Sequence, residues 1–148
     1  MRSPESPAVP AGGDVHRHTM RHRVRYRECD AMGVVYHTHY LDWFEAARTE
    51  ALRELGLAYR ELEAAGVMMP VVGLAVRYHG AARYDDVVEV DVGLHAPAGA
   101  RVETDYAVRV AGGERPIVTG TVTLAFVDSE RRRPMAPPAN VVALWGRG

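Results

Sequence analysis

The first periodic segment of the chain predicts a strand. Residues 16–28, HRHTMRHRVRYRE, alternate between one side that carries Met20, His22, Val24 and Tyr26 and another that carries arginines. A period of two with charge on one face is typical of a half-exposed β-strand. Residues 1–15 are rich in proline and glycine with little to bury. We expect them to form a disordered tail ahead of a single domain over residues 16–148.

The apolar pattern then changes to that of a helix. Five apolar residues follow one another at spacings of four, three, four and four: Tyr40, Phe44, Ala47, Ala51 and Leu55. These spacings place them on one stripe of an α-helix, and Gly56 is its predicted C-terminal cap. A shorter helical segment is expected over residues 59–65, and a last helical turn at VVALW.

The rest of the chain predicts four more strands. Residues 70–79 are apolar on both sides, as expected of a central strand under a helix. Residues 88–94, 102–110 and 118–126 alternate, and their short connections favour antiparallel hairpins. The order of strand, long helix and a four-stranded meander predicts an α+β domain whose antiparallel sheet wraps around one helix. The edges of such a sheet need a partner, so we expect dimers that form through the sheet.

Composition excludes several kinds of chemistry. All 18 basic residues are arginine, so no lysine can serve as a Schiff base, a phosphate-loop ligand or a general base. A formal net charge of -1 gives no reason to expect a nucleic-acid partner. No apolar run approaches the roughly 20 residues of a membrane span, and no secretory signal is expected. With Cys29 as the single cysteine, no intrachain disulfide is expected, which favours the cytoplasm.

The candidate chemistry lies in residues 28–48, ECDAMGVVYHTHYLDWFEAAR. Asp30 precedes the long helix, at whose start the backbone N–H groups have no intrahelical acceptor and the helix dipole favours negative charge. A carboxylate near such donors meets two needs of ester or thioester hydrolysis. The carboxylate supplies a base or nucleophile, and the amides stabilise the oxyanion. The alternative is that Asp30 only caps a helix or shapes a turn.

The same segment resembles the 4-hydroxybenzoyl-CoA thioesterase family of hotdog-fold proteins, especially its YbgC-type acyl-CoA thioesterases. The run VRYRECDAMGVVYHTHYLDWFEAAR is similar to the family's D-x-x-G-V-V-Y-H-x-x-Y hallmark before the central helix. VRYHGAARYDDVVEV and FVDSERRRPMAPP extend the likeness, which covers roughly residues 20–142. The resemblance implies a hotdog fold, in which a five-stranded antiparallel sheet wraps a long central helix. It also implies a homodimer, or a homotetramer built from two dimers.

The resemblance further implies roles for individual residues. Asp30 matches the family's catalytic acid, which acts as nucleophile or as general base. Gly33 would allow the backbone to approach the substrate closely. The backbone N–H near Tyr36 and His37 matches the oxyanion donor, and the His37 side chain is expected to orient substrate or water. The implied substrate is an acyl-CoA, with no metal and no other cofactor.

Other side chains are candidates for contacts with the rest of the substrate. They are Tyr40, Glu45, Tyr78, Arg101, Arg131, Arg132 and Arg133. The four arginines would hold CoA phosphates, and the alternative for Arg131, Arg132 and Arg133 is a solvated loop. Glu45 would be a helical carboxylate at the site, and its alternative is an ion pair with Arg48 or Arg53. Tyr78 has the alternative of a core or interface residue.

Several neighbouring residues have simpler interpretations. Cys29 could act with His37 as a thiol nucleophile, but a small core residue is the expected role. His37 and His39 form an H-x-H pair with no third ligand nearby in sequence, so no metal site is expected. Asp85 and Asp86 are expected in a turn. The histidines near the tail, His16, His18 and His22, are expected to be solvated among arginines.

We therefore predict a cytoplasmic acyl-CoA thioesterase that releases a carboxylic acid and free CoA. Two other functions would use the same residues. One is a hotdog hydratase or dehydratase that acts on an acyl thioester, and the other is a non-catalytic module that binds acyl thioesters. The identity of the acyl group, aliphatic or aromatic, is left open by the sequence.

Overall fold

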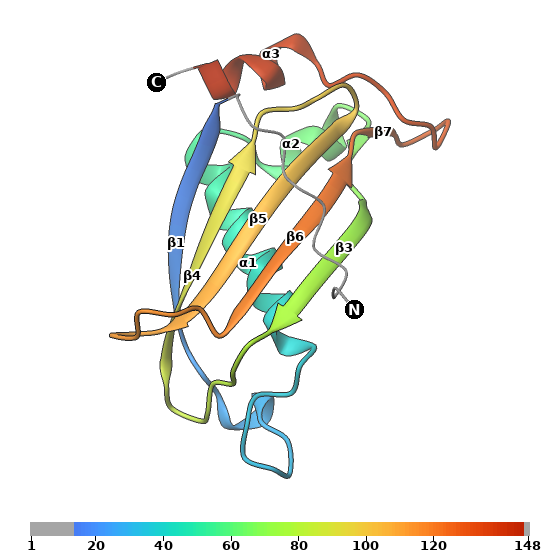
Figure 1. Cartoon of the computed structure of the whole chain (residues 1–148). Helices are drawn as coiled ribbons and strands as arrows, with labels where there is room; N and C mark the ends of the chain where they lie inside the picture. The colour runs from blue at the N-terminus through green and yellow to red at the C-terminus, as the bar shows by residue number, and fades with distance from the viewer. Residues whose placement is uncertain (1–13, 147–148) are drawn as a thin grey trace, which may run out of the picture.

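The computed structural model describes residues 14–146, and it shows one long helix packed against one antiparallel sheet (Figure 1). The sheet has the strand order β1-β4-β5-β6-β3. Its strands are β1 (Val15–Arg23), β3 (Val71–Tyr78), β4 (Val87–His95), β5 (Arg101–Val110) and β6 (Val118–Ala125). A separate two-stranded sheet pairs β2 (Val67–Met68) with β7 (Val127–Asp128). The expected tail falls almost wholly outside the described residues, and Val15 already belongs to β1.

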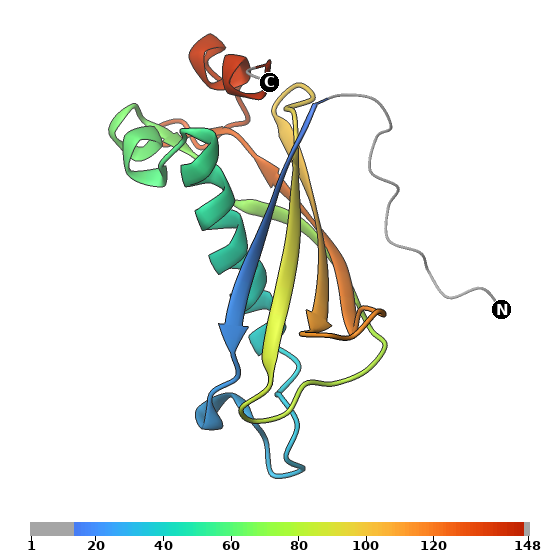
Figure 2. The ribbon, with the colours of Figure 1, turned by 90° about the vertical axis from the view of Figure 1, so that its left-hand side faces the viewer.

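The long helix α1 (His39–Leu55) matches its prediction and lies along one face of the sheet (Figure 2). Gly56 caps it in the left-handed conformation, with φ of 107°, and donates its N–H to the carbonyls of Leu52 and Arg53. The remaining helical segments are α2 (Tyr59–Ala64), α3 (Ala139–Val142) and the 3-10 turns η1 (Tyr26–Glu28) and η2 (Ala143–Gly146). Within residues 14–146, no helix is long and apolar enough to cross a membrane.

The core lies between α1 and the inner face of the sheet. Alternate residues of β4, β5 and β6 are almost completely buried, which confirms their predicted periodicity. The Phe44 ring of α1 stacks on the Tyr106 ring of β5 with centroids 4.3 Å apart. Gly120 of β6 makes room for this stack, because a Cβ there would lie 2.7 Å from Cε2 of Phe44. The aromatic pair fixes the helix against the middle of the sheet.

The strand predicted at residues 70–79 exists, but the prediction that it is central is wrong. β3 pairs only with β6 and forms an edge of the sheet. Its apolar residues Val71, Val72, Leu74 and Tyr78 are 46–53% exposed. The predicted meander of four strands therefore contains only three consecutive neighbours, β4, β5 and β6. The segment after β3 carries the chain across to β4 on the far side of the sheet. A doubly apolar strand can face solvent within one chain, so apolar residues on both sides do not establish burial.

The first strand ends earlier than predicted, and its histidines are not solvated. After Arg23 the chain leaves β1 and turns into η1, where Tyr26 is 80% exposed. His16, His18 and His22 lie on the side of β1 that faces α1, and carboxylates contact all three rings. The alternation of β1 thus places three histidines, together with the buried Met20, against the helix.

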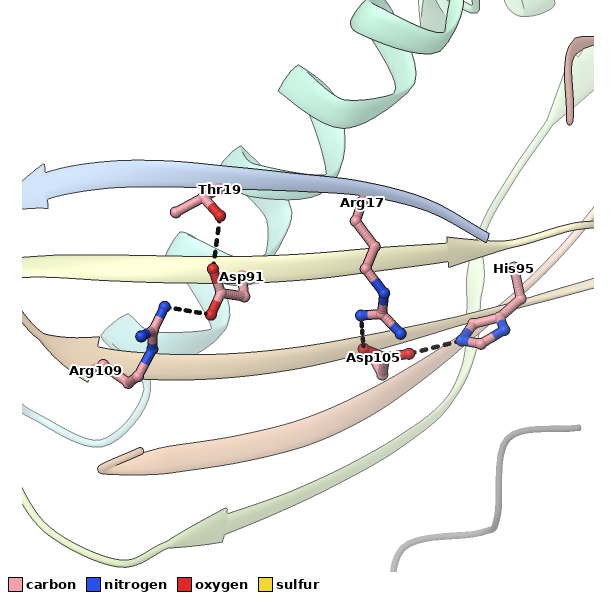
Figure 3. A network of polar contacts seen from close by, with 6 residues as sticks. All are labelled: Arg17, Thr19, Asp91, His95, Asp105 and Arg109. Carbon is pink, nitrogen blue, oxygen red and sulfur yellow. Dashed lines mark hydrogen bonds and ion pairs between the residues drawn. The ribbon is translucent and has the colours of Figure 1, made fainter. Parts of the chain in front are cut away.

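The outer face of the sheet is polar, and Figure 3 shows two contact networks on it. Asp105 contacts Arg17 at 3.5 Å and His95 at 2.6 Å, while Asp91 accepts hydrogen bonds from Thr19 and Arg109, both at 2.6 Å. Gly93 leaves room for the contact between Arg17 and Asp105. A Cβ at this position would lie 3.0 Å from the Asp105 carboxylate. Polar cross-strand contacts thus cover the outer face, while the apolar core lies on the α1 side.

Candidate active site

Asp30 lies in the loop between η1 and α1 and shapes a tight turn there. Its Oδ1 accepts the N–H of Met32 at 2.8 Å, and its carbonyl accepts the N–H of Gly33 at 3.0 Å. Gly33 has a φ of 82°, which glycine adopts readily. The Oδ2 atom of Asp30 accepts no hydrogen bond from residues 14–146. Asp30 thus shapes a turn through Oδ1, and its other carboxylate oxygen remains open to another partner.

A hollow of about 420 Å³ adjoins the Asp30 side chain. Its lining residues are Tyr26, Cys29, Asp30, Ala31, Gly33 and Tyr84. The rings of Tyr26 and Tyr84 meet edge to face with centroids 5.7 Å apart. The half-buried carboxylate of Asp30 therefore borders a space that a small acyl group could enter.

The backbone amides before α1 divide into paired and unpaired groups. The N–H of Tyr36 donates to the carbonyl of Glu28 at 2.9 Å, so this amide is not an open donor, contrary to expectation. The N–H of His39 is also paired, at 3.0 Å to the carbonyl of Tyr36. Within residues 14–146, the N–H groups of His37 and Thr38 have no acceptor. These two amides are open donors at the N-terminus of α1.

Glu28 anchors the Asp30 loop to the helix, a role that the sequence did not reveal. Glu28 is 8% exposed, and its carboxylate accepts hydrogen bonds from Nε1 of Trp43 at 2.7 Å and Nε2 of His22 at 2.8 Å. The N–H of Arg25 donates to the same carboxylate at 2.7 Å. Burial alone would raise the pKa of Glu28, but the three donors outweigh it and lower this pKa. Glu28 therefore stays ionised beside the loop.

The edge strand β3 contacts the same loop through Tyr78. The hydroxyl of Tyr78 donates to the carbonyl of His37 at 3.0 Å, and its ring meets the His37 ring edge to face at 6.1 Å. Burial raises the pKa of Tyr78, which keeps the hydroxyl protonated as a donor. The exposed His37 side chain lies beside Tyr36, with ring centroids 4.5 Å apart. Tyr78 thus fixes the residue whose amide is open.

Burial corrects the predicted substrate contact of Tyr40, whereas for Glu45 only the alternative of an ion pair is corrected. Tyr40 is 1% exposed, and its hydroxyl oxygen accepts the N–H of Ala82 at 3.0 Å, so Tyr40 belongs to the core and not to a substrate surface. Glu45 is exposed and, within residues 14–146, forms no ion pair with Arg48 or Arg53. Arg48 is itself 6% exposed, so it cannot form the surface pair that helical spacing suggested.

The predicted CoA-binding arginines lie far from Asp30 in the same chain. Arg101 begins β5, and the Asp30 loop lies near the other end of that strand (Figure 1). Arg131, Arg132 and Arg133 follow β7 at the same end as Arg101 and are exposed. A strand of this length spans on the order of 30 Å. One chain therefore does not bring these arginines together with Asp30.

Comparison with known proteins identifies the family. A family model described as the thioesterase-like superfamily matches residues 24–145. The acyl-CoA thioesterase YbgC of Haemophilus influenzae is 37% identical over 124 residues, which cover 83% of this chain and 90% of that protein. The acyl-CoA thioester hydrolase YbgC of Escherichia coli is 33% identical over 82% of this chain and 90% of its own length.

A solved structure supports the same assignment. The crystal structure of a hypothetical protein TT1821 from Thermus thermophilus has a TM-score of 0.79 and 33% identity, and the match covers 86% of this chain and 96% of that one. The resemblance to YbgC-type proteins and the hotdog fold that it implies are both confirmed. The chain belongs to the thioesterase-like superfamily of hotdog-fold proteins.

Proposed function

We propose that this protein is an acyl-CoA thioesterase that hydrolyses a thioester to a carboxylic acid and free CoA. The observation that carries the proposal is the composition of one loop. Asp30 presents an open carboxylate oxygen to a hollow, and the same loop ends in the unpaired amides of His37 and Thr38. The curated relatives named as acyl-CoA thioesterases support this reaction class.

The loop supplies both halves of the chemistry. Asp30 either attacks the thioester carbonyl carbon or removes a proton from a water that attacks it. The negative charge that develops on the carbonyl oxygen is stabilised by the amides of His37 and Thr38, with the helix dipole behind them. The C–S bond then breaks, and the CoA sulfur leaves as a thiolate and takes up a proton. If Asp30 is the nucleophile, water hydrolyses the resulting anhydride and restores the carboxylate.

The exposed edge strand β3 supports a homodimer. Val71, Val72, Leu74 and Tyr78 expose large apolar surface along β3, which among the described strands pairs on one side only. Two copies that pair antiparallel through β3 about a two-fold axis would bury this surface. The Val71 end of one strand would then lie beside the Tyr78 end of the other.

This dimer would also explain the position of the arginine run. Arg131, Arg132 and Arg133 follow β7, which pairs with β2 just before the Val71 end of β3. In the dimer they would approach the catalytic loop of the partner, and CoA phosphates would be held across the interface. The proposed site therefore needs both copies.

The substitution Asp30→Asn tests the reaction. It should lower kcat for thioester hydrolysis by at least about 100-fold, because the base or nucleophile is lost while the shape is kept. The measurement is thiol release from a panel of short, long and aryl acyl-CoA substrates. Asp91→Asn is the matched control, because Asp91 lies on the outer face of the sheet, away from the loop (Figure 3).

The same assay separates the other functions. Hydrolysis that persists within a few-fold in Asp30→Asn would contradict the role of Asp30. Formation of an unsaturated acyl thioester without release of thiol would indicate a hydratase or dehydratase. Binding of acyl-CoA by the wild type without turnover, unchanged in Asp30→Asn, would indicate a binding module.

A further inference from the structure

Arg48 is a buried cation in the middle of α1 that has no anionic partner among residues 14–146. Its side chain is 6% exposed, and no carboxylate within residues 14–146 lies within ion-pair distance of it. Its described hydrogen bonds are to two phenols: Nε donates to the hydroxyl of Tyr59 at 3.3 Å, and Nη1 donates to that of Tyr106 at 3.0 Å. A guanidinium has five N–H groups, so three remain for another partner.

A chain of buried hydroxyls holds Arg48 in place. The Tyr106 hydroxyl lies 2.8 Å from Oγ1 of Thr104, and that oxygen donates to the carbonyl of Val122 at 2.8 Å. Because Thr104 gives its proton to the carbonyl, the Tyr106 hydroxyl donates to Thr104 and accepts from Arg48. Burial raises the pKa of Tyr106, so its hydroxyl stays neutral. The network fixes the guanidinium and leaves its charge uncompensated.

The free side of Arg48 faces a groove of about 500 Å³ between α1, α2 and the start of β3. The groove is lined by Glu45, Arg48, Tyr59, Glu63, Val67, Met68, Met69, Pro70 and Val71. Most of this lining is apolar, and Arg48 is its one buried charged group, since Glu45 and Glu63 are exposed. The groove thus offers an apolar wall with a single fixed cation in its interior.

Such an arrangement is unfavourable unless an anion completes it. A buried charge without a counter-charge is destabilising, and well-packed apolar residues of similar volume are often as stable as a buried ion pair. A carboxylate is the group that a guanidinium fork pairs with in two parallel hydrogen bonds. Glu45 and Glu63 are exposed to water, so solvent and salt screen their repulsion of an incoming anion.

We propose that Arg48 binds the far end of the substrate's acyl group and selects acyl groups that end in a carboxylate. This inference rests on the proposed thioesterase function and on the β3 dimer. Val71 lines the groove and opens β3, so the two-fold pairing brings the groove beside Tyr78 and the catalytic loop of the other copy. An acyl chain from that loop would run along the apolar wall toward Arg48. The CoA moiety, with its several phosphates, does not match a mostly apolar groove with one cation.

Matched pairs of substrates test the selection. Adipoyl-CoA is compared with hexanoyl-CoA, and suberoyl-CoA with octanoyl-CoA, so that each pair has the same number of carbons and differs only in the terminal carboxylate. The wild type should prefer the carboxylate-ended member in kcat/KM for at least one pair. Arg48→Met should reduce that preference by at least about 10-fold, the scale of one lost charged hydrogen bond. Arg53→Met is the control, because Arg53 is exposed on the same helix and does not line this groove.

Two further measurements keep the test decisive. If Arg48→Met fails to fold, Arg48→Lys keeps the charge without the planar fork and should still weaken the preference. Binding of free hexanoate and octanoate, compared with the neutral hexanamide and octanamide, is measured by calorimetry on the wild type and on the folded Arg48 variant, and needs no turnover. Preferential binding of the carboxylates that is lost in the variant would support the Arg48 site even if the protein hydrolysed no thioester. Equal binding of the carboxylates and the amides, or a substrate preference unchanged in Arg48→Met, would overturn the inference while leaving thioesterase activity itself intact.

Discussion

The Glu28 anchor gives a quantitative prediction for stability. Glu28 is buried between η1 and α1, and its two oxygens accept three hydrogen bonds, from His22, Arg25 and Trp43. Glu28→Gln keeps the size of the side chain but replaces one acceptor oxygen with an NH₂ group. Because Oε1 accepts from His22 and Arg25 while Oε2 accepts from Trp43, either orientation of the amide places a donor against a donor.

The magnitude follows from the donor that loses its acceptor. A buried donor left without a partner is destabilising by about 1–3 kcal/mol, and the remaining bonds lose the strengthening that the negative charge provides. We expect Glu28→Gln to lower the free energy of unfolding by about 2–3 kcal/mol in total. For a domain of this size, the melting temperature should fall by roughly 5–10 °C.

Urea and thermal unfolding at pH 7 measure this effect, with Glu114→Gln as the control because Glu114 is exposed in a turn. The difference in the free energy of unfolding between the wild type and Glu28→Gln should also depend on pH. Since the pKa of Glu28 is lowered in the folded protein, its stabilisation is present above the ordinary glutamate pKa and is lost as pH falls through the lowered value. A loss of stability no larger than that of the control, or a difference that grows on acidification, would refute the reasoning.

Three other predictions concern the core, the edge strands and the dimer. Gly120→Ala should destabilise the fold by about 1–2 kcal/mol in urea unfolding, because its Cβ would press on the Phe44 ring; a gain in stability would contradict the close contact. Hydrogen bonding to Glu50 raises the pKa of His18; burial opposes this shift, and Glu54 adds to it. The stabilisation of the fold by His18 is therefore complete below the ordinary histidine pKa and is lost as pH rises through the raised value. Melting curves of His18→Asn between pH 5 and 8 should therefore lack this decline. Leu74→Arg on β3 should convert the proposed β3 dimer to monomers in sedimentation experiments and lower activity; a stable, active dimer of this variant would exclude pairing through this edge.

Local patterns determined the secondary structure. The stripe from Tyr40 to Leu55 and the glycine after it predict α1 and its cap, because helical spacing and left-handed caps depend on residues close in sequence. The alternation of apolar and polar residues likewise predicts β4, β5 and β6, because successive side chains of a strand point to opposite faces of the sheet. The motif around Asp30 was sufficient to identify the family, since a long motif records the residues that a loop of defined shape requires.

The tertiary structure decided which residues meet. Residues 70–79 read as central because both faces are apolar, but whether a strand is central or at an edge depends on pairing with residues far away in sequence. The same holds for Glu28 and Arg48, whose charges are buried only once η1, α1 and β5 come together. Periodicity reports how each side chain points relative to its own element, whereas burial, open amides and unpaired charges arise from contacts between elements. The sequence by itself therefore determined the elements and the family, and only the folded chain revealed the anchor of the Asp30 loop and the cation in the groove.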